Sequence, residues 1–439
     1  MITLDPYLVV RAAALYITGV LTLVVWLWRR PGKARLTGAL LAFAWNLSVV
    51  LALHIAAVRL GWWTFDARGG VLLGMPVDLY LVWAWLWSAI PAVAFPSLPL
   101  GIVTLVVLVF DFALMPIAAP VLRLGPHWLL GEAIGLGLGL IPSQLLARWT
   151  AHGEHLRARV VLQIFAFSGL LGFVLPVVAI TQSGTTWRSP LAYPMWQLSL
   201  FLQILMLPAV IGLSAVQEFA TRGYGTPVPF DPPQRLVTTG IYAFVRNPMQ
   251  LSAVLMLIGM GVILRNVWVA AAGVMAHLYS VGLAGWDEDD DLRKRFGDDW
   301  IAYRRSVPRW FPRLRPWRLP NQPPALLYVA ASCGMCSEVA QWFGRRGTIG
   351  LRIVPAETHP SAALQRITYE PCDGTSAASG IEAIARSLEH IHVGWAFVGF
   401  ALCLPIVGEF VQLLADASGA GPRTILGSGI GAGNGKFLP

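Results

Sequence analysis

Residues 240–250 read GIYAFVRNPMQ, and residues 288–310 read EDDDLRKRFGDDWIAYRRSVPRW. The apolar residues between them leave room for one helical hairpin through a membrane. Pro248 lacks a backbone N–H and disfavours helical backbone at Asn247, so we expect a helix to begin there. The first amides of such a helix can bind an anionic group. The acidic run follows on the same side of the membrane. Together the two motifs predict a site for a small charged ligand where the membrane meets water.

The composition predicts an integral-membrane protein. Of 439 residues, 56% are hydrophobic and only 13% are charged, which excludes an ordinary soluble protein. Apolar windows of about 18 to 22 residues recur, the length that crosses roughly 30 Å of hydrocarbon. A buried core helix could explain one such window but not a long series. We expect an all-α membrane protein with about nine transmembrane helices, at about 8–28, 36–58, 71–95, 98–120, 126–147, 158–180, 195–216, 247–264 and 266–285.

The positions of Lys and Arg predict the orientation. With the N-terminus outside, the cytoplasmic loops hold far more of these residues than the outer loops, as the positive-inside rule requires. The outer loops hold only Arg59, Arg68, Arg123, Arg188 and Arg265. The net charge of +9 therefore needs no nucleic-acid partner, because topology and anionic lipid headgroups account for it. The first apolar stretch is long and lacks a small-residue cleavage site, so we expect a retained span in a bacterial-type cell membrane.

The chain divides by composition into successive parts. Residues 1–216 are nearly all membrane spans, and residues 217–318 contain both motifs. The Pro-rich residues 319–324 predict a stiff linker. A small domain follows at 325–418, and the Gly-rich residues 419–439 predict a flexible tail. With this orientation both motifs and the small domain are on the cytoplasmic side.

The paired motifs resemble the cofactor-binding signature of the isoprenylcysteine carboxyl methyltransferase and phospholipid N-methyltransferase families. Those membrane enzymes have G-x-Y-x-x-x-R-[HN]-P-x-Y, a helical hairpin, and then E-E-x-x-L-x-x-x-F-G-x-x-[YW]-x-x-Y-x-x-x-V-P. The resemblance covers about 230–313 and implies S-adenosylmethionine-dependent methylation of a small or lipophilic acceptor from the bilayer. It implies cofactor contacts by Gln234, Arg235, Leu236, Val237, Tyr242, Arg246, Asn247, Pro248, Met249, Gln250, Glu288 and Asp289.

Three positions depart from the family pattern. Gln250 stands where the families have a Tyr, and Asp289 stands where they have a second Glu. Ala284 replaces an Arg that serves the substrate in isoprenylcysteine methyltransferases. The last departure weakens the case for a prenylcysteine carboxylate as the acceptor.

Other functions stay open at this point. NADPH-dependent sterol reductases share a related hairpin and end motif, so a membrane reductase is one alternative. A membrane-anchored thiol-disulfide redox protein, with the hairpin as a mere anchor, is another. Arg246 and Arg293–Arg295 could also be ordinary positive-inside anchors, with the acidic run a solvated helix start. Binding of S-adenosylmethionine rather than NADPH would distinguish the methyltransferase from these alternatives.

Polar side chains inside the apolar windows are costly and tend to face a cavity or a partner. His277 lies in the predicted hairpin, where a general base could take a proton from an amine or hydroxyl acceptor. A helix–helix hydrogen bond is the alternative for His277 and for the other such residues, which are His54, Asp111, Glu132, Gln163 and Gln203. The GLGLG run at 135–139 lies mid-span without a preceding strand. It therefore predicts close helix packing rather than a nucleotide-binding loop.

The residues after the linker predict a small α/β domain of thioredoxin-like type. A strand at 325–331 precedes Cys333-Gly-Met-Cys336, which opens a helix to about Arg346, and a second strand follows at 351–355. The stretch resembles the DCC family, whose usual pattern is Asp-Gly-x-Cys-x-x-Cys. Here Ala330-Ala331 replaces that pair, so Cys333 and Cys336 are either redox residues or structural thiols.

Two further readings concern the same domain. A zinc site is a weaker alternative, because Cys372 and Cys403 form no second CxxC pair, and we expect no metal site. Residues 393–415 are apolar enough for a tenth span. We expect them instead to form the closing apolar helix of the domain.

Overall fold

The structure is a computed structural model that describes residues 5–66, 68–226, 233–320, 322–331, 333–360, 363–422 and 425–426. Contacts divide the chain into two compact units. The first unit contains Met1–Phe201, Tyr224–Pro233 and Leu257–Met275. The second contains Leu202–Gly223, Gln234–Met256 and Ala276–Pro439, and so holds both sequence motifs as well as the C-terminal α/β residues.

The first seven predicted spans are helical and of membrane-crossing length. Within the described ranges, seven helical stretches are long and apolar enough to cross a membrane. They comprise α1 (Pro6–Arg29), α2 (Lys33–Leu60), α3 (Val77–Trp87) with α4 (Ala89–Ala94), α5 (Leu100–Ile117), α6 (Trp128–Gly135) with α7 (Ile141–His152), α8 (Leu156–Gly169) with α9 (Leu175–Ser183), and α10 (Met195–Arg222). The chain is an integral-membrane protein.

The third span begins later than predicted. Residues 71–76 form a hairpin of β2 (Val71–Leu72) and β3 (Met75–Pro76) instead of the first turns of a helix. The reason is local, because Leu73 and Gly74 between these strands have left-handed φ angles of 52° and 90°. Near this hairpin β1 (Trp63–Phe65) pairs with β4 (Leu122–Leu124) in antiparallel register.

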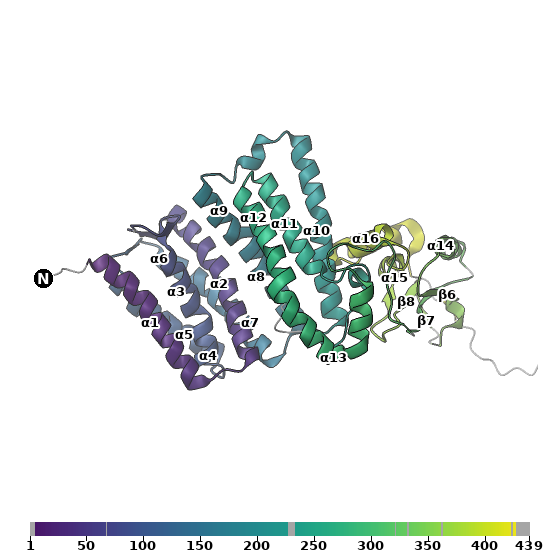
Figure 1. Ribbon diagram of the computed structural model, residues 1–439, viewed down its shortest axis with the longest axis horizontal. Helices are drawn as coiled ribbons and strands as arrows, with labels where there is room; N and C mark the ends of the chain where they lie inside the picture. The colour runs from purple at the N-terminus through teal and green to yellow at the C-terminus, as the bar shows by residue number, and fades with distance from the viewer. Residues whose placement is uncertain are drawn as a thin grey trace, which may run out of the picture. The chain divides into compact units, whose positions relative to one another are not determined.

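Large aromatic side chains and small residues pack the core of the first unit. Trp87 is completely buried, and Trp63 is nearly so. A Cβ on Gly135 would lie 2.5 Å from the Trp87 ring, and one on Gly139 would lie 2.8 Å from Asn46 Oδ1. The predicted close packing at the GLGLG run is therefore confirmed at these two glycines. α1, α2 and α3 of this unit run side by side (Figure 1).

The hairpin between the motifs forms, and its two helical stretches, 248–263 and 267–284, match the predicted bounds to within one residue at each end. α11 (Pro248–Ile263) has 16 residues and α12 (Val267–Tyr279) has 13. At 1.5 Å per residue α11 measures about 24 Å, less than the roughly 30 Å of the hydrocarbon. The helix of α12 continues through the π-helical turn η5 (Ser280–Ala284) into α13 (Gly285–Ser306). α13 bends at Gly297, whose φ is 53°.

The C-terminal residues form a four-stranded sheet in the order β6-β5-β8-β9. β5 is parallel to β6 and antiparallel to β8, and β9 is antiparallel to β8. The strands are β5 (Ala325–Val329), β6 (Leu351–Pro355), β8 (Thr368–Glu370) and β9 (Ala378–Ser379), with α14 (Gly334–Gly344) after β5 and α15 (Ile381–Leu388) after β9. The predicted strand, helix and strand are each present, and Leu327, Phe343 and Ala383 are buried in their core.

Residues 393–415 form two helices where one was expected. α16 (Val393–Leu402) and α17 (Pro405–Ala415) are bent by 88° relative to each other. Pro405 cannot continue a helix from Leu402, which accounts for the break. Ala396 and Phe400 of α16 are buried against Tyr242 and Phe244.

Candidate functional site

The two sequence motifs meet through backbone hydrogen bonds. The amide of Arg246 donates to Pro308 O at 2.9 Å, and the amide of Asn247 donates to Arg309 O at 3.2 Å. Farther along, the amide of Arg313 donates to Phe244 O at 3.0 Å. The end of the second motif therefore runs along the first, and residues about 60 positions apart form one structure.

Aromatic packing fixes the second motif on the first. Trp300 and Tyr303 of α13 are almost fully buried, and Leu236 packs against them. The Tyr303 hydroxyl donates to Tyr242 O at 2.9 Å. Tyr242 and Val237 are themselves buried core residues. Three of the predicted cofactor contacts therefore have packing roles, namely Leu236, Val237 and Tyr242. Gln234 and Arg235 are exposed.

Arg246 is held from several sides. Its Nη1 donates to Arg304 O at 3.1 Å, and its guanidinium carbon lies 5.6 Å from the centre of the Trp300 ring. Burial lowers the pKa of Arg246, and the nearby charge of Arg309 lowers it further. Asp289 forms a 3.0 Å ion pair with Arg304. The side chain of Glu288 lies outside the described residues.

α11 begins at Pro248, as the sequence predicts. Asn247 O accepts the amide of Leu251 at 3.0 Å, and Asn247 Nδ2 donates to Gln250 Oε1 at 2.8 Å. The same Gln250 oxygen accepts a hydrogen bond from Ser280 in η5. Gln250, which stands where the families that the motif resembles have a Tyr, therefore joins the start of α11 to the turn after α12. Met249 packs against the core around Tyr242.

His277 lies beside the second motif. It is half-buried in the last turn of α12, with its ring centroid 4.3 Å from that of Trp310. The Trp310 indole Nε1 is buried and has no hydrogen-bond partner among the described atoms. The predicted catalytic residue and an unpaired N–H donor of the second motif are thus adjacent.

The other polar residues of the predicted spans have separate surroundings. His54 Nε2 is 3.0 Å from Leu73 O, and Asp111 accepts a 2.7 Å hydrogen bond from Trp87 Nε1. Glu132 interacts with Asp111, while neither of its carboxylate oxygens accepts a hydrogen bond from a described donor. These three belong to the first unit and His277 to the second. Gln163 is fully buried and Gln203 is exposed.

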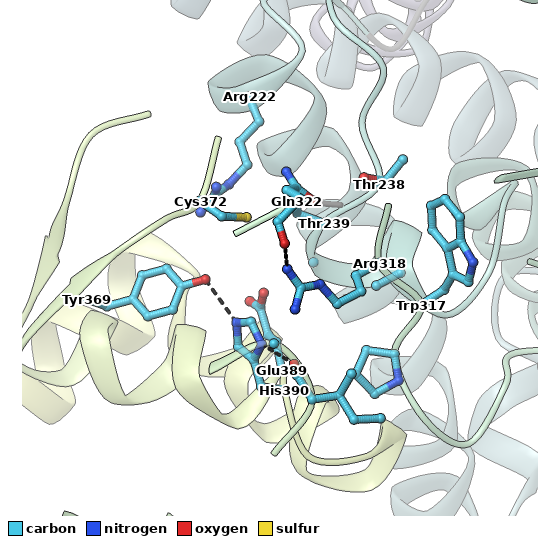
Figure 2. Close-up of a pocket in the computed structure, with 15 residues that line it drawn as sticks. Arg222, Thr238, Thr239, Trp317, Arg318, Gln322, Tyr369, Cys372, Glu389 and His390 are labelled. Atoms are coloured by element: carbon cyan, nitrogen blue, oxygen red, sulfur yellow. Dashed lines mark hydrogen bonds between the residues drawn. The ribbon is translucent and has the colours of Figure 1, made fainter. Parts of the chain in front are cut away.

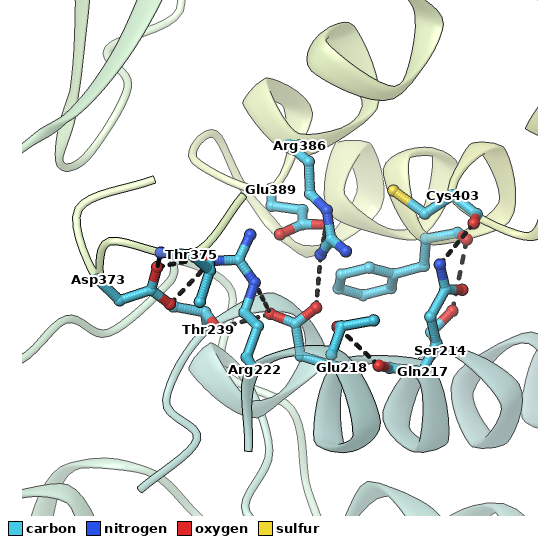
Figure 3. A network of polar contacts seen from close by, with 12 residues as sticks. Ser214, Gln217, Glu218, Arg222, Thr239, Asp373, Thr375, Arg386, Glu389 and Cys403 are labelled. Carbon is cyan, nitrogen blue, oxygen red and sulfur yellow. Dashed lines mark hydrogen bonds and ion pairs between the residues drawn. The ribbon is translucent and has the colours of Figure 1, made fainter. Parts of the chain in front are cut away.

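A buried cluster of charges lies next to the first motif, and the sequence analysis missed it (Figure 3). Glu218 of α10 accepts a hydrogen bond from the Thr239 hydroxyl at 2.5 Å. It also forms ion pairs with Arg222 at 2.9 Å and with Arg386 of α15 at 2.5 Å. Arg386 contacts Glu389 at 3.3 Å. Glu218 and Arg386 are 168 positions apart, so no local pattern could have indicated their pairing.

A cavity of about 50 Å³ lies beside this cluster (Figure 2). Thr238, Thr239 and Gly240 line one part of it, and His390 of the C-terminal residues lines another. His390 Nδ1 donates to Ile349 O at 2.7 Å, and its Nε2 accepts from the Tyr369 hydroxyl at 3.0 Å. Burial lowers the pKa of His390 to about 4, so this ring is neutral near pH 7. The space holds a few water molecules at most.

The CxxC residues lie at the start of α14. Cys333 is the residue immediately before the helix, and Cys336 is in its first turn. Both side chains are half-buried near Tyr328 and Ala330. This is the position that the sequence predicts for them.

Comparison with family models gives a match to the family described as phospholipid methyltransferase, over residues 197–299. The match begins in α10, includes the first motif and the hairpin, and ends within α13. No curated protein and no solved structure matches the chain. Together with the membrane-crossing helices, the match supports a membrane methyltransferase.

Proposed function

We propose that the protein is an S-adenosylmethionine-dependent methyltransferase of the membrane, acting on a small or lipophilic acceptor that enters from the bilayer. The backbone pairing of the two motifs carries the proposal, because it unites Arg246 and Asn247 with Pro308 and Arg309. The family match over 197–299 is an independent argument for the same activity.

The residues present suit the three polar parts of this cofactor, which are a carboxylate, an ammonium and an adenosine. Helix α11 starts at Pro248, so its first turn can receive a carboxylate. Asp289 is already paired with Arg304, which makes Glu288 the better carboxylate for the ammonium. The buried indole N–H of Trp310 can donate to an acceptor atom on the ligand.

When bound, S-adenosylmethionine supplies a methyl group on a sulfonium sulfur, and this methyl is transferred by direct displacement. The chain therefore has to orient the reactants and exclude water. The apolar helices α11 and α12 provide a dry approach for a lipophilic acceptor. His277 would take the proton that an amine or hydroxyl acceptor loses.

Two observations guide the choice of the first acceptor to test. Ala284 stands where an arginine serves the substrate in isoprenylcysteine methyltransferases, so a prenylcysteine carboxylate is disfavoured. The matched family is described as acting on phospholipid, which makes an amine headgroup the first acceptor to test.

Calorimetry on the full chain in lipid nanodiscs tests the cofactor. We expect binding of S-adenosylmethionine and none of NADPH. Glu288→Gln should weaken binding by about 1.5–3 kcal/mol, the worth of a hydrogen bond to a charged group. Asp290→Asn, in the same acidic run but exposed, is the matched control and should bind as wild type does. Binding of NADPH in place of S-adenosylmethionine would favour a reductase.

We also propose that residues 325–418 form a thioredoxin-like domain of DCC type. The order strand, CxxC at a helix start, and parallel strand, followed by two antiparallel strands and a helix, supports this. A dithiol–disulfide exchange assay on wild type and Cys333→Ser tests redox activity. Equal exchange by both would leave the two thiols a structural role.

A further inference from the structure

Glu218 lies at the centre of a buried ion-pair network. Its side chain is only 3% exposed, and its two oxygens are shared among three donors. Arg386 Nη1 is 2.5 Å from Oε2, while Arg222 Nε is 2.9 Å from Oε1. The Thr239 hydroxyl donates to Oε1 as well. In such a site the position of the carboxylate is fixed by its partners.

The first motif rests directly on this carboxylate. Gly240 opens the motif with a φ of +57°, and a Cβ there would lie 2.8 Å from Glu218 Cδ. Thr239, the residue before it, is hydrogen-bonded to the same group. The backbone that leads into Tyr242 therefore packs against Glu218. Any displacement of Glu218 would move this backbone.

Arg386 belongs to the C-terminal α/β residues. It lies in the last turn of α15 and pairs with Glu389, the residue that follows this helix. A second contact from the same part of the chain reinforces the network, since Arg222 pairs with Asp373 at 2.9 Å. The Phe400 ring of α16 also lies edge-on to Phe244, with centroids 6.2 Å apart. Removing Arg386 would leave Glu218 with Arg222 as its remaining ion-pair partner among the described residues, in a buried site where an incompletely paired charge is unfavourable.

We propose that the C-terminal α/β domain is part of the cofactor site, with Arg386 acting as a positioning residue that fixes Thr239–Tyr242 through Glu218. The proposal rests on the proposed function, because Tyr242, at the end of this segment, is one of the residues assigned to S-adenosylmethionine. The domain is then part of the enzyme's site and not an independent module joined by a linker. Cofactor affinity depends on a side chain far outside the matched family region.

Two measurements on the full chain in nanodiscs test this. The first is the Kd for S-adenosylmethionine, measured well below the Tm of each variant. The second is hydrogen exchange of the 239–242 amides without cofactor. Arg386→Gln should raise Kd at least about tenfold, since small misplacements of positioning groups are costly, and should speed exchange at 239–242. Arg386→Lys keeps the charge and should recover most of the affinity, although it loses the planar fork.

Arg366→Gln is the matched control. It removes an ion pair with Asp416 in the same part of the chain, 2.8 Å from Nη2 to Oδ2, that does not include Glu218. Any fall in Tm that it causes should leave Kd and exchange at 239–242 unchanged. If Arg386→Gln does not fold, Glu218→Gln replaces it, because the amide oxygen can still accept from Thr239 while the charge is lost.

The outcomes separate the two proposals. Unchanged Kd and unchanged exchange in Arg386→Gln would overturn the positioning role even if wild type binds S-adenosylmethionine. A wild type that does not bind S-adenosylmethionine would overturn the proposed function. In that case the exchange rates alone decide whether Arg386 fixes the segment.

Discussion

Gly240 shows how one residue joins local backbone chemistry to the packing of the site. Its φ of +57° is accessible to glycine at no steric cost, and its missing side chain leaves room for the Glu218 carboxyl group. A sequence pattern can identify such a glycine as the start of a motif. It cannot show that the neighbour across from it is a buried carboxylate.

We expect Gly240→Ala to destabilise the protein by more than about 2 kcal/mol, because left-handed strain adds to a clash with Glu218. Gly347→Ala is the matched control, since Gly347 has a φ of +60° with no heavy atom within 4 Å of the added Cβ. Denaturant unfolding of both variants measures the difference. Equal losses would mean that Glu218 moves aside freely.

Glu389 is expected to make stability depend on pH. Burial raises its pKa from 4.5 to about 7, although the nearby Arg386 lowers it. Between these values the folded state retains a proton that the unfolded state has lost, so stability falls as pH rises from 4.5 to 7 and is level above. Glu389→Gln removes this fall in stability, because glutamine does not titrate. The Tm of the variant relative to wild type should rise across that window and then stay constant, and a constant difference throughout would contradict the assignment.

At the scale of elements, α5 and α6 bring two carboxyl groups together inside the first unit. Asp111 accepts from Trp87 Nε1, whereas Glu132 interacts with Asp111 and has no described donor. No described cation pairs with these two carboxyl groups, so negative charge on both of them in a desolvated core would be strongly unfavourable.

Glu132→Gln should therefore leave the Tm equal or higher, because the amide offers Asp111 a donor without adding charge. Asp111→Ala should cost about 1–3 kcal/mol, because it leaves the Trp87 indole unpaired. Thermal unfolding in nanodiscs compares them. A Glu132→Gln variant as unstable as Asp111→Ala would show that Glu132 is needed as an ion.

The sequence best predicted the features that depend on residues close together in the chain. Apolar length predicted the first seven spans, Pro248 predicted the start of α11, and the small residues at 135–139 predicted close packing. The hairpin at 71–76 was missed because its residues are as apolar as a helix and only their φ angles differ. The Glu218–Arg386 pair was missed because it depends on tertiary structure.

At the scale of the whole molecule, the expected orientation puts the motifs and the α/β residues on the cytoplasmic side. In a variant with the four native cysteines replaced by serine, Ser306→Cys should resist a membrane-impermeant thiol reagent in intact cells and react after lysis. Thr186→Cys, in the loop after α9, should react in intact cells. Labelling of Ser306→Cys before lysis would reverse the orientation and, with it, access to cytosolic cofactor.

The wide separation of Glu218 and Arg386 also sets an order of events during synthesis. The two residues are 168 positions apart, so at about 5–20 residues per second Glu218 leaves the ribosome roughly 10–30 s before Arg386. During that time Arg222, one turn farther along α10, is available as its neutralising neighbour. Arg386, the last ion-pair partner of Glu218, is synthesised only when the chain reaches α15. A nascent chain stalled before residue 386 would therefore carry an incompletely paired carboxylate at the end of α10, a feature by which quality control could distinguish it from the finished protein.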